Sequence, residues 1–200
     1  MVKEVPTLLL ATRNPGKLKE LAALLGDVPF NLVTLTQVGV EEEVEETGKT
    51  LEENATIKVA AYGRLSGLPA LADDSGLEVE ALGGQPGHLS SRYAGEGATD
   101  SRRIALLHEK LENIPEEAWR ARFRCVIAVA WPAQQAELYT GECYGKIIRQ
   151  PRGSSGFGYD PVFVPNGREQ TFAEIEPEEK HTISHRADAF AKLVAEQFGA

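Results

Sequence analysis

The sequence predicts a single α/β domain that spans residues 1–200. Short apolar segments typical of buried strands alternate with amphipathic segments typical of helices. No Pro- or Ser-rich linker separates these segments, and the sequence contains neither a repeat nor a low-complexity stretch. A chain of 200 residues is long enough to bury a substantial core. We therefore expect one compact unit of helices and strands without an internal domain boundary.

The N-terminal segment predicts a strand, a tight turn and a helix. Residues 7–12 form a short apolar strand, Asn14-Pro15-Gly16 breaks it, and residues 17–25 have helical periodicity. This arrangement points backbone N–H groups and a helix N-terminus toward an anion. The loop lacks the Gly-x4-Gly-Lys-Ser/Thr spacing of a Walker A motif. A phosphate-binding loop and a plain strand-to-helix turn therefore both remain open.

A capping box predicts a second helix that begins after Thr50 and runs to about residue 65. Thr50 can cap the helix, and Glu53, three residues later, can reach back to the backbone. Asn54 and Lys58 are four residues apart and share one helix face. That face suits either the polar wall of a cleft or an ordinary solvated surface.

The pair Asp73–Asp74 is the most informative feature of the chain. The apolar strand 68–72 leads directly into it, and we expect Ser75-Gly76 to turn the chain. Two adjacent carboxylates repel each other unless a cation lies between or beside them. Mg²⁺ prefers carboxylate oxygens and usually keeps waters and substrate phosphates as its other ligands. The pair predicts a metal site, although Asp-Asp-Ser-Gly is also an ordinary turn sequence.

The remaining elements follow from the same patterns. We expect a strand over 77–82, a helix over 99–111, antiparallel strands over 123–131 and 137–148, a short strand over 161–164, and a final helix over 184–198.

A glycine-rich loop over residues 153–158 presents Phe157, and Asp160 follows it. An aromatic face can stack on a nucleobase, and a nearby carboxylate can accept a hydrogen bond from the base. The alternative is a turn whose Phe157 packs in the core. Residues 180–186 then place two cations and two imidazoles at the start of the final helix, where they could meet phosphate or a carbonyl oxygen.

The net charge of −9 argues against general affinity for DNA or RNA, which depends on clustered Lys and Arg. It does not exclude a small anion, because a local basic cluster can reverse the field in one site. Glu45 and Glu46 lie in an acidic segment that supplies either metal ligands or a solvated loop. Cys125 and Cys143 belong to no metal-binding motif and fit a reducing compartment. No apolar run suits a signal peptide or a bilayer span, so we expect a cytoplasmic protein that does not bind membranes. The net charge adds the expectation that it binds no nucleic acid polymer.

These loops together are the parts of a site for Mg²⁺ and a nucleoside triphosphate. Eight motifs along the chain contain the residues of these loops. In order, they are residues 10–17 (LATRNPGK), 45–48 (EETG), 53–55 (ENA) with Lys58, 72–77 (ADDSGL), 82–87 (LGGQPG), 91–95 (SRYAG), 156–161 (GFGYDP) and 184–186 (SHR). Their set closely resembles the Ham1/RdgB-like family of inosine/xanthosine triphosphate pyrophosphatases over nearly the whole chain. The resemblance implies hydrolysis of ITP, dITP and XTP to the monophosphate and pyrophosphate. It also implies a long curved mixed sheet with helices that form two lobes around a central nucleotide-binding cleft, a homodimer, and one Mg²⁺ per subunit, or more with substrate bound.

The resemblance further implies residue roles. Asp74 takes the catalytic and Mg²⁺-binding position, with Glu46 preferred over Glu45 as the second metal ligand. The implied substrate contacts are Thr12, Arg13, Asn14, Pro15, Gly16 and Lys17 on the triphosphate, Lys58 and Ser75 beside them, and Phe157, Gly158, Tyr159, Asp160, Lys180, His185 and Arg186 on the base.

Two other functions remain compatible with parts of this pattern. One is a pyrophosphatase of related fold that acts on modified pyrimidine nucleotides, against which Phe157 and the Ser-His-Arg motif argue. The other is a nucleotide-binding module without chemistry. A pure binder has no need of a water-activating carboxylate such as Asp74, and turnover with Mg²⁺ distinguishes the two.

Overall fold

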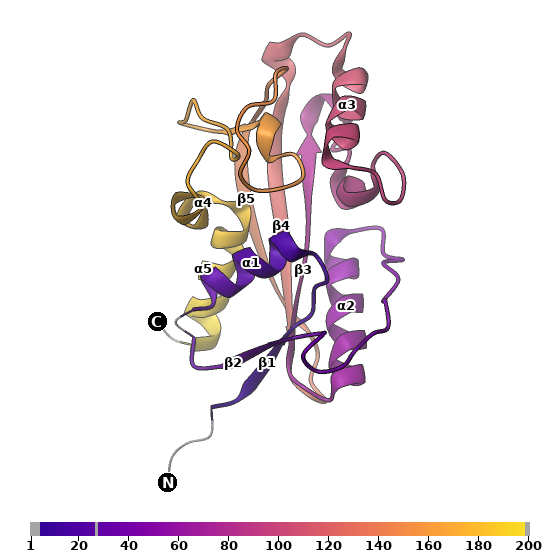
Figure 1. Ribbon diagram of the computed structural model, residues 1–200, viewed down its shortest axis with the longest axis vertical. Helices are drawn as coiled ribbons and strands as arrows, with labels where there is room; N and C mark the ends of the chain where they lie inside the picture. Colours follow the sequence, from indigo (N-terminus) through magenta and orange to yellow (C-terminus); the bar gives the residue numbers. More distant parts are fainter. Residues whose placement is uncertain (1–4, 27, 199–200) are drawn as a thin grey trace. The chain divides into compact units, whose positions relative to one another are not determined.

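The computed structural model describes residues 5–26 and 28–198 (Figure 1). The expectation that the chain has no signal peptide depends partly on residues 1–4, which lie outside the described residues. The strands are β1 (Thr7–Leu10), β2 (Asn31–Thr34), β3 (Ala70–Val79), β4 (Arg120–Ala130), β5 (Glu137–Ile147) and β6 (Phe163–Pro165). The α-helices are α1 (Pro15–Leu24), α2 (Leu51–Ser66), α3 (Asp100–Leu111), α4 (Pro177–Ile183) and α5 (His185–Phe198). Short 3-10 helices are η1 (Glu80–Leu82), η2 (Gly87–Arg92), η3 (Glu116–Ala118) and η4 (Asp160–Val162).

The six strands form one mixed sheet in the order β2-β1-β3-β4-β5-β6. Strand β1 pairs in parallel with both β2 and β3, and Leu9 of β1 lies opposite Ala70 of β3. Strand β5 pairs antiparallel with β6. The predicted α/β class with a mixed sheet is confirmed. None of the helices among the described residues is both long and apolar enough to cross a membrane.

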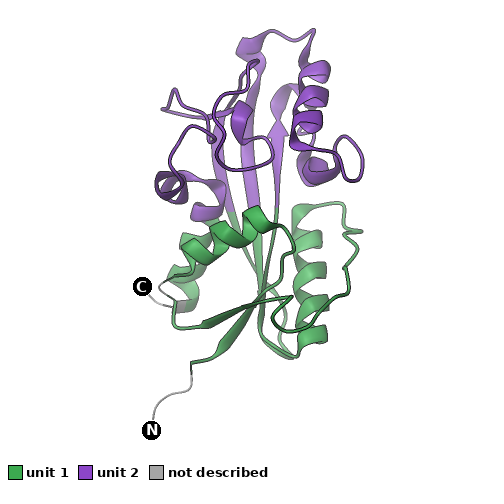
Figure 2. Ribbon diagram, in the orientation of Figure 1, with its two compact units in different colours: residues 1–74, 126–140, 189–200 green, residues 75–125, 141–188 purple. Residues whose placement is uncertain are grey.

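The chain folds into two compact units, each with its own hydrophobic core (Figure 2). Unit 1 comprises residues 1–74, 126–140 and 189–200, and unit 2 comprises residues 75–125 and 141–188. We describe the two units separately.

Local capping explains where the helices of unit 1 begin. Asn14 caps α1 by accepting a hydrogen bond from the Lys17 N–H at 3.1 Å, and Pro15 occupies the first turn. Proline suits that position because its ring fixes the backbone angle that the helix needs. The helix therefore starts two residues earlier than expected. Thr50 caps α2 as predicted, with its Oγ1 3.1 Å from the Glu53 nitrogen.

The core of unit 2 is built around aromatic rings. Phe123 packs edge-on against Phe163 with ring centroids 4.8 Å apart, and it stacks on Phe172 at 5.8 Å. Such pairs contribute roughly 0.5–1.5 kcal/mol beyond the area that they bury. Helix α3, capped by Thr99, adds Leu107 and other apolar side chains to this cluster. The rigid core fixes the elements that carry the glycine-rich loop.

The expected turn at Ser75-Gly76 is wrong, because β3 runs without interruption from Ala70 to Val79. The expected strand over 77–82 is the second half of β3 followed by η1. Gly76 serves a close approach of two backbone segments: a Cβ at this position would lie only 2.1 Å from the Gly87 carbonyl oxygen. Ser90 Oγ accepts a hydrogen bond from the Leu77 N–H at 2.9 Å at the same place.

We predict that Gly76→Ala lowers the free energy of unfolding by ~1–3 kcal/mol, the usual cost of overpacking. The added methyl group would overlap the Gly87 carbonyl group, which belongs to the backbone and cannot simply rotate away. Chemical denaturation monitored by circular dichroism measures the change. Gly26→Ala is the matched control, since a Cβ there would come no closer than 3.5 Å to another atom. Equal stabilities for the two variants would contradict the account given for Gly76.

The basic segment 180–186 does not lie at the start of one final helix. Lys180 belongs to the short helix α4, and Ser184 separates α4 from α5 with an extended backbone (ψ 159°). Pro177 starts α4, and the Ser184 Oγ accepts a hydrogen bond from the Ala187 N–H at 3.2 Å at the start of α5. A helix of seven residues is too short to give a clear periodic pattern, which explains why the sequence did not predict it. The expected strand over 161–164 is likewise shifted, to η4 followed by β6.

Candidate active site

The loop between β1 and α1 is organised by its own side chains. Thr12 Oγ1 accepts a hydrogen bond from the Asn14 N–H at 3.2 Å, and the Asn14 side chain accepts one from the Lys17 N–H. The loop ends as the capped N-terminus of α1, which attracts anions because its N–H groups point outward along the helix axis. Lys17 is the residue of this loop that reaches the acidic pair.

Arg13 is placed differently from the other residues of this loop. Its Nη2 donates hydrogen bonds to the carbonyl oxygens of Val40 and Glu42, at 2.9 and 2.8 Å. The guanidinium group therefore holds the backbone of the acidic segment. Local sequence patterns could not predict this contact, because the two acceptor residues lie 27 and 29 positions away from Arg13.

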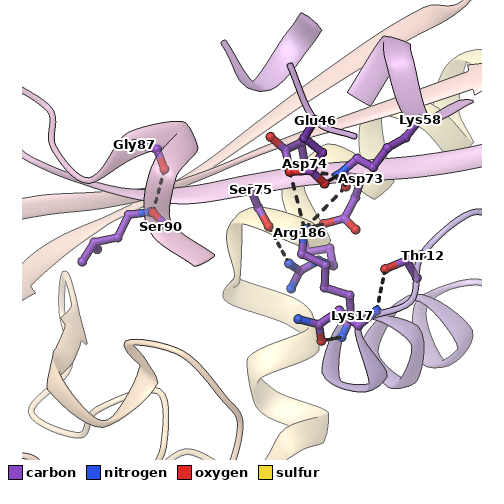
Figure 3. Close-up of polar contacts among 12 residues, drawn as sticks. Thr12, Lys17, Glu46, Lys58, Asp73, Asp74, Ser75, Gly87, Ser90 and Arg186 are labelled. Carbon is purple, nitrogen blue, oxygen red and sulfur yellow. Dashed lines mark hydrogen bonds and ion pairs between the residues drawn. The ribbon is translucent and has the colours of Figure 1, made fainter. Parts of the chain in front are cut away.

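Asp73 and Asp74 are both buried in β3, with 1% and 5% of their surfaces exposed, and two lysines lie beside them (Figure 3). Lys17 Nζ is 3.2 Å from Asp73 Oδ2 and 4.0 Å from Asp74 Oδ1. Lys58 Nζ donates hydrogen bonds to Asp74 Oδ1 at 2.9 Å and to the Asp73 carbonyl oxygen at 2.7 Å. Lys58 also forms an ion pair with Glu46 Oε1 at 2.9 Å. The structure thus brings Lys17, Glu46, Lys58 and the acidic pair into one cluster, in which Asp73, Asp74 and Lys58 are buried and Lys17 and Glu46 are partly exposed.

Burial and charge act in opposite directions on these groups. Burial raises the pKa of Asp74 above its usual value, although Lys17 and Lys58 work against that shift. Burial alone would lower the pKa of Lys58, but the carboxylates of Asp74, Asp73 and Glu46 outweigh it and raise that pKa. The charged form of Lys58 is therefore favoured in spite of burial. Asp74 is a carboxylate that takes up a proton more readily than an exposed one.

The donor set fits a hard divalent cation. Asp74 Oδ2 is buried and has no hydrogen-bond partner among the described residues, so this oxygen is available to coordinate a metal ion. Glu46 reaches the same lysine as Asp74, whereas Glu45 is exposed. Within the described part of the chain no three His, Cys, Asp or Glu side chains are grouped to hold a metal ion. One or two carboxylates are nevertheless enough for Mg²⁺ that is completed by waters and substrate phosphates.

Side chains of α2 hold the segment that carries Glu46. Asn54 is fully buried, and its Oδ1 accepts a hydrogen bond from the Gly48 N–H at 2.8 Å. Tyr62 Oη accepts one from the Val44 N–H at 3.2 Å, and Glu53 Oε2 accepts one from the Lys49 N–H. No functional role was assigned to Tyr62 from the sequence. Its phenol was the available signal, since a buried tyrosine hydroxyl normally finds a polar partner.

In unit 2, the glycine-rich loop presents a half-buried aromatic ring. Phe157 is not part of the apolar core, contrary to the alternative considered above. Lys180 Nζ lies 5.4 Å from the centre of this ring, and the Arg186 guanidinium carbon lies 5.8 Å from it. Arg186 also donates a hydrogen bond to Ser75 Oγ at 2.9 Å (Figure 3). Four of the residues predicted to contact substrate are thus neighbours in unit 2, namely Ser75, Phe157, Lys180 and Arg186.

The other predicted residues of unit 2 have mainly internal contacts. Asp160 Oδ2 accepts hydrogen bonds from the Phe157 N–H at 2.9 Å and from Lys180 Nζ at 2.6 Å. Tyr159 is buried and donates its hydroxyl hydrogen to the Ser90 carbonyl oxygen at 3.0 Å. The buried imidazole of His185 stacks on the core ring of Phe123, with centroids 4.8 Å apart. These side chains shape the loop and its surroundings.

Comparison with known proteins gives concordant matches over nearly the full chain. The Ham1 family model matches residues 8–196. A dITP/XTP pyrophosphatase of Geobacter sulfurreducens is 48% identical over 186 residues, which cover 93% of this chain and 94% of that protein. The Bacillus subtilis dITP/XTP pyrophosphatase is 44% identical over 92% of this chain and 93% of its own length. The solved structure of a HAM1 protein from Coxiella burnetii superposes with a TM-score of 0.88 at 42% identity, covering 98% of this chain and all of that one. The Staphylococcus aureus Ham1 protein gives a TM-score of 0.85 at 37% identity, covering 96% and 98%. On these matches, the chain belongs to the Ham1 family.

Proposed function

We propose that this chain hydrolyses ITP, dITP and XTP to the nucleoside monophosphate and pyrophosphate and so removes non-standard purine nucleotides from the cellular pool. The observation that carries the proposal is the largely buried cluster of Asp73, Asp74, Lys17, Lys58 and Glu46. It combines an acidic pair with two fixed cations, which is what transfer of a phosphoryl group requires. The names of the similar proteins from Geobacter sulfurreducens and Bacillus subtilis support the same substrate class.

In this reaction a water attacks the α-phosphorus and pyrophosphate leaves. Asp74 accepts the proton of the attacking water, a role favoured by a buried carboxylate whose pKa burial raises above its usual value. Lys17 and Lys58 offset the negative charge that gathers on the leaving pyrophosphate. Asp73, whose carboxylate contacts Lys17, fixes the position of that lysine.

Asp74 and Glu46 would hold a divalent cation, for which we propose Mg²⁺. When bound, such an ion neutralises phosphate oxygens and lowers the pKa of a coordinated water. The unpartnered Oδ2 of Asp74 supports this assignment, as does the ion pair that keeps Glu46 beside Lys58.

The proposed base contacts explain how adenine is rejected. Hypoxanthine and xanthine carry a 6-oxo acceptor where adenine carries an amino donor. A pocket that offers donors at this position, such as Arg186, would leave the adenine amine facing another donor. Unpaired polar groups in a closed site discriminate strongly, by ~10⁴ in favourable cases. Phe157 would stack on the purine, and we expect both ribose and deoxyribose nucleotides to be accepted.

The decisive experiment incubates the purified protein with Mg²⁺ and, separately, ITP, dITP, XTP, GTP and ATP. Pyrophosphate and orthophosphate are measured independently. We expect pyrophosphate from ITP, dITP and XTP and little from ATP or GTP. Orthophosphate would mean attack at the γ-phosphorus and would overturn the mechanism. Absence of turnover would leave a nucleotide-binding module as the better description.

We also propose that residues 1–200 form one functional domain and that the protein is a homodimer in the cytoplasm without affinity for nucleic acid polymers. A single cooperative unfolding transition, the same by near- and far-UV circular dichroism, tests the first statement. Light scattering after size-exclusion chromatography tests whether the protein is a homodimer. Fractionation of cells tests whether it is cytoplasmic, and a DNA or RNA mobility-shift assay tests whether it binds nucleic acid polymers.

A further inference from the structure

We propose that Asp100 is a positioning residue that holds Phe157 in the orientation needed to stack on the base. The inference rests on the proposed function and names a residue that sets its base selectivity. Asp100 Oδ2 accepts a hydrogen bond from the Gly158 N–H at 2.8 Å, across 58 residues of sequence. Asp160 Oδ2 accepts one from the Phe157 N–H at 2.9 Å. Two carboxylates from different segments thus hold the peptide groups on either side of Phe157.

Asp100 is itself fixed in place. It is the first residue of α3, which Thr99 caps, and its second oxygen contacts Arg103. Arg103 Nη1 in turn donates hydrogen bonds to the carbonyl oxygens of Ser91 and Ala98, at 2.7 and 2.6 Å. Each of the two carboxylate oxygens of Asp100 thus has its own partner, Arg103 for one and the Gly158 N–H for the other. Through Asp100 and Arg103, Gly158 is therefore connected to α3 and to the turn that precedes this helix.

The loop needs such a hold because its own sequence does not fix its conformation. Gly156 (φ +75°) and Gly158 (φ +64°) both adopt left-handed backbone angles that other residues rarely take. Glycine has the largest conformational freedom to lose, so a loop of this composition is ordered only by contacts. A recess of about 450 Å³, lined in part by Asp100, Ser101 and His108, lies on one side of the loop. On that side the loop is held by the hydrogen bond between the Gly158 N–H and Asp100 rather than by packing.

Two substitutions separate this role from a merely structural one. Asp100→Ala removes both the acceptor for Gly158 and the ion pair with Arg103, whereas Asp100→Asn keeps an acceptor oxygen and loses only the ion pair. For the Ala variant we expect the KM for ITP to rise about tenfold, which corresponds to ~1.4 kcal/mol. Its kcat should change much less, because no reacting atom is touched. Its preference for ITP over ATP should fall, because a base that stacks less firmly on Phe157 is aligned less firmly against the donor at Arg186. The Asn variant should keep most of the wild-type affinity and preference.

Steady-state kinetics with ITP and ATP, together with calorimetric affinities for ITP, supply the readouts. Glu109→Ala, at an exposed carboxylate on the same helix, is the matched control for the loss of one charge. If the Ala variant does not fold, Asp100→Ser repeats the test, since its short side chain cannot reach Gly158.

Wild-type KM and base preference in the Ala variant would overturn the inference. Equal impairment of the Ala and Asn variants, with lowered thermal stability, would also overturn it, because the ion pair with Arg103 would then be what matters. If the wild-type protein releases no pyrophosphate, the proposed function fails instead. The calorimetric affinities for ITP still decide the role of Asp100 in that case.

Discussion

Asp74→Asn is expected to lower kcat by roughly 10²- to 10⁴-fold, the usual contribution of a positioned general base. The amide has the same shape as the carboxylate but can neither accept a proton from water nor bind Mg²⁺ as strongly. Lys58 keeps an oxygen acceptor at this position and its ion pair with Glu46, so the fold and the nucleotide affinity should survive. Steady-state kinetics with ITP and calorimetric binding of ITP measure the two quantities.

The same variant has a signature in the pH profile. A general base must be ionised, so kcat/KM of the wild type should fall as the pH drops through the pKa of Asp74. Burial raises that pKa above the ordinary value of 3.8, which places the acid limb at higher pH than for an exposed aspartate. Asp74→Asn should lack this limb, and Glu41→Gln, at an exposed carboxylate, should retain it. A kcat within a few-fold of the wild-type value would remove Asp74 from the role.

Lys58→Met is expected to damage both activity and stability. The substitution keeps an unbranched chain in the buried position but removes the cation from contact with Asp74 and Glu46. Removing one partner of a buried ion pair typically costs about 3–5 kcal/mol, because the remaining charges are left uncompensated. We expect the free energy of unfolding, measured in urea with EDTA present, to fall by an amount in that range, and kcat to fall with it.

Two controls make the result for Lys58 interpretable. Lys49→Met removes an exposed lysine from the same unit and should leave stability unchanged. Adding Asp74→Asn to Lys58→Met should restore part of the lost stability, since the neutral amide no longer buries an unpaired charge. Wild-type stability in the single variant would show that the cluster does not depend on Lys58.

The sequence predicted those parts of the site that depend on local patterns. Thr50 caps α2 because Ser and Thr favour that position, and Asn54 and Lys58 share a face because helical neighbours recur every four residues. The charge argument was also sound: the acidic pair needed cations, and Lys17 and Lys58 supply them. The resemblance to the family was needed to identify which lysines these are.

Features that depend on distant partners escaped prediction. Ser75-Gly76 has the composition of a turn, but pairing within the sheet overrides that preference, and the reason for Gly76 lies at Gly87. The resemblance placed Arg13 on the triphosphate with the rest of its loop, yet its guanidinium group donates hydrogen bonds to carbonyl groups of the acidic segment. Asp100 resembled any acidic residue in the first turn of a helix. Its bond to Gly158 follows only from the tertiary structure.

The path of the chain through the two units bears on how such a protein can be altered. The backbone passes from one unit to the other four times, within β3, β4, β5 and α5, and never in a loop. Neither unit is therefore encoded by a continuous stretch of gene. Recombination cannot exchange one of them as a module, and no terminal truncation can isolate it. A loop such as 153–158, which lies wholly within unit 2, can by contrast be replaced as one continuous segment.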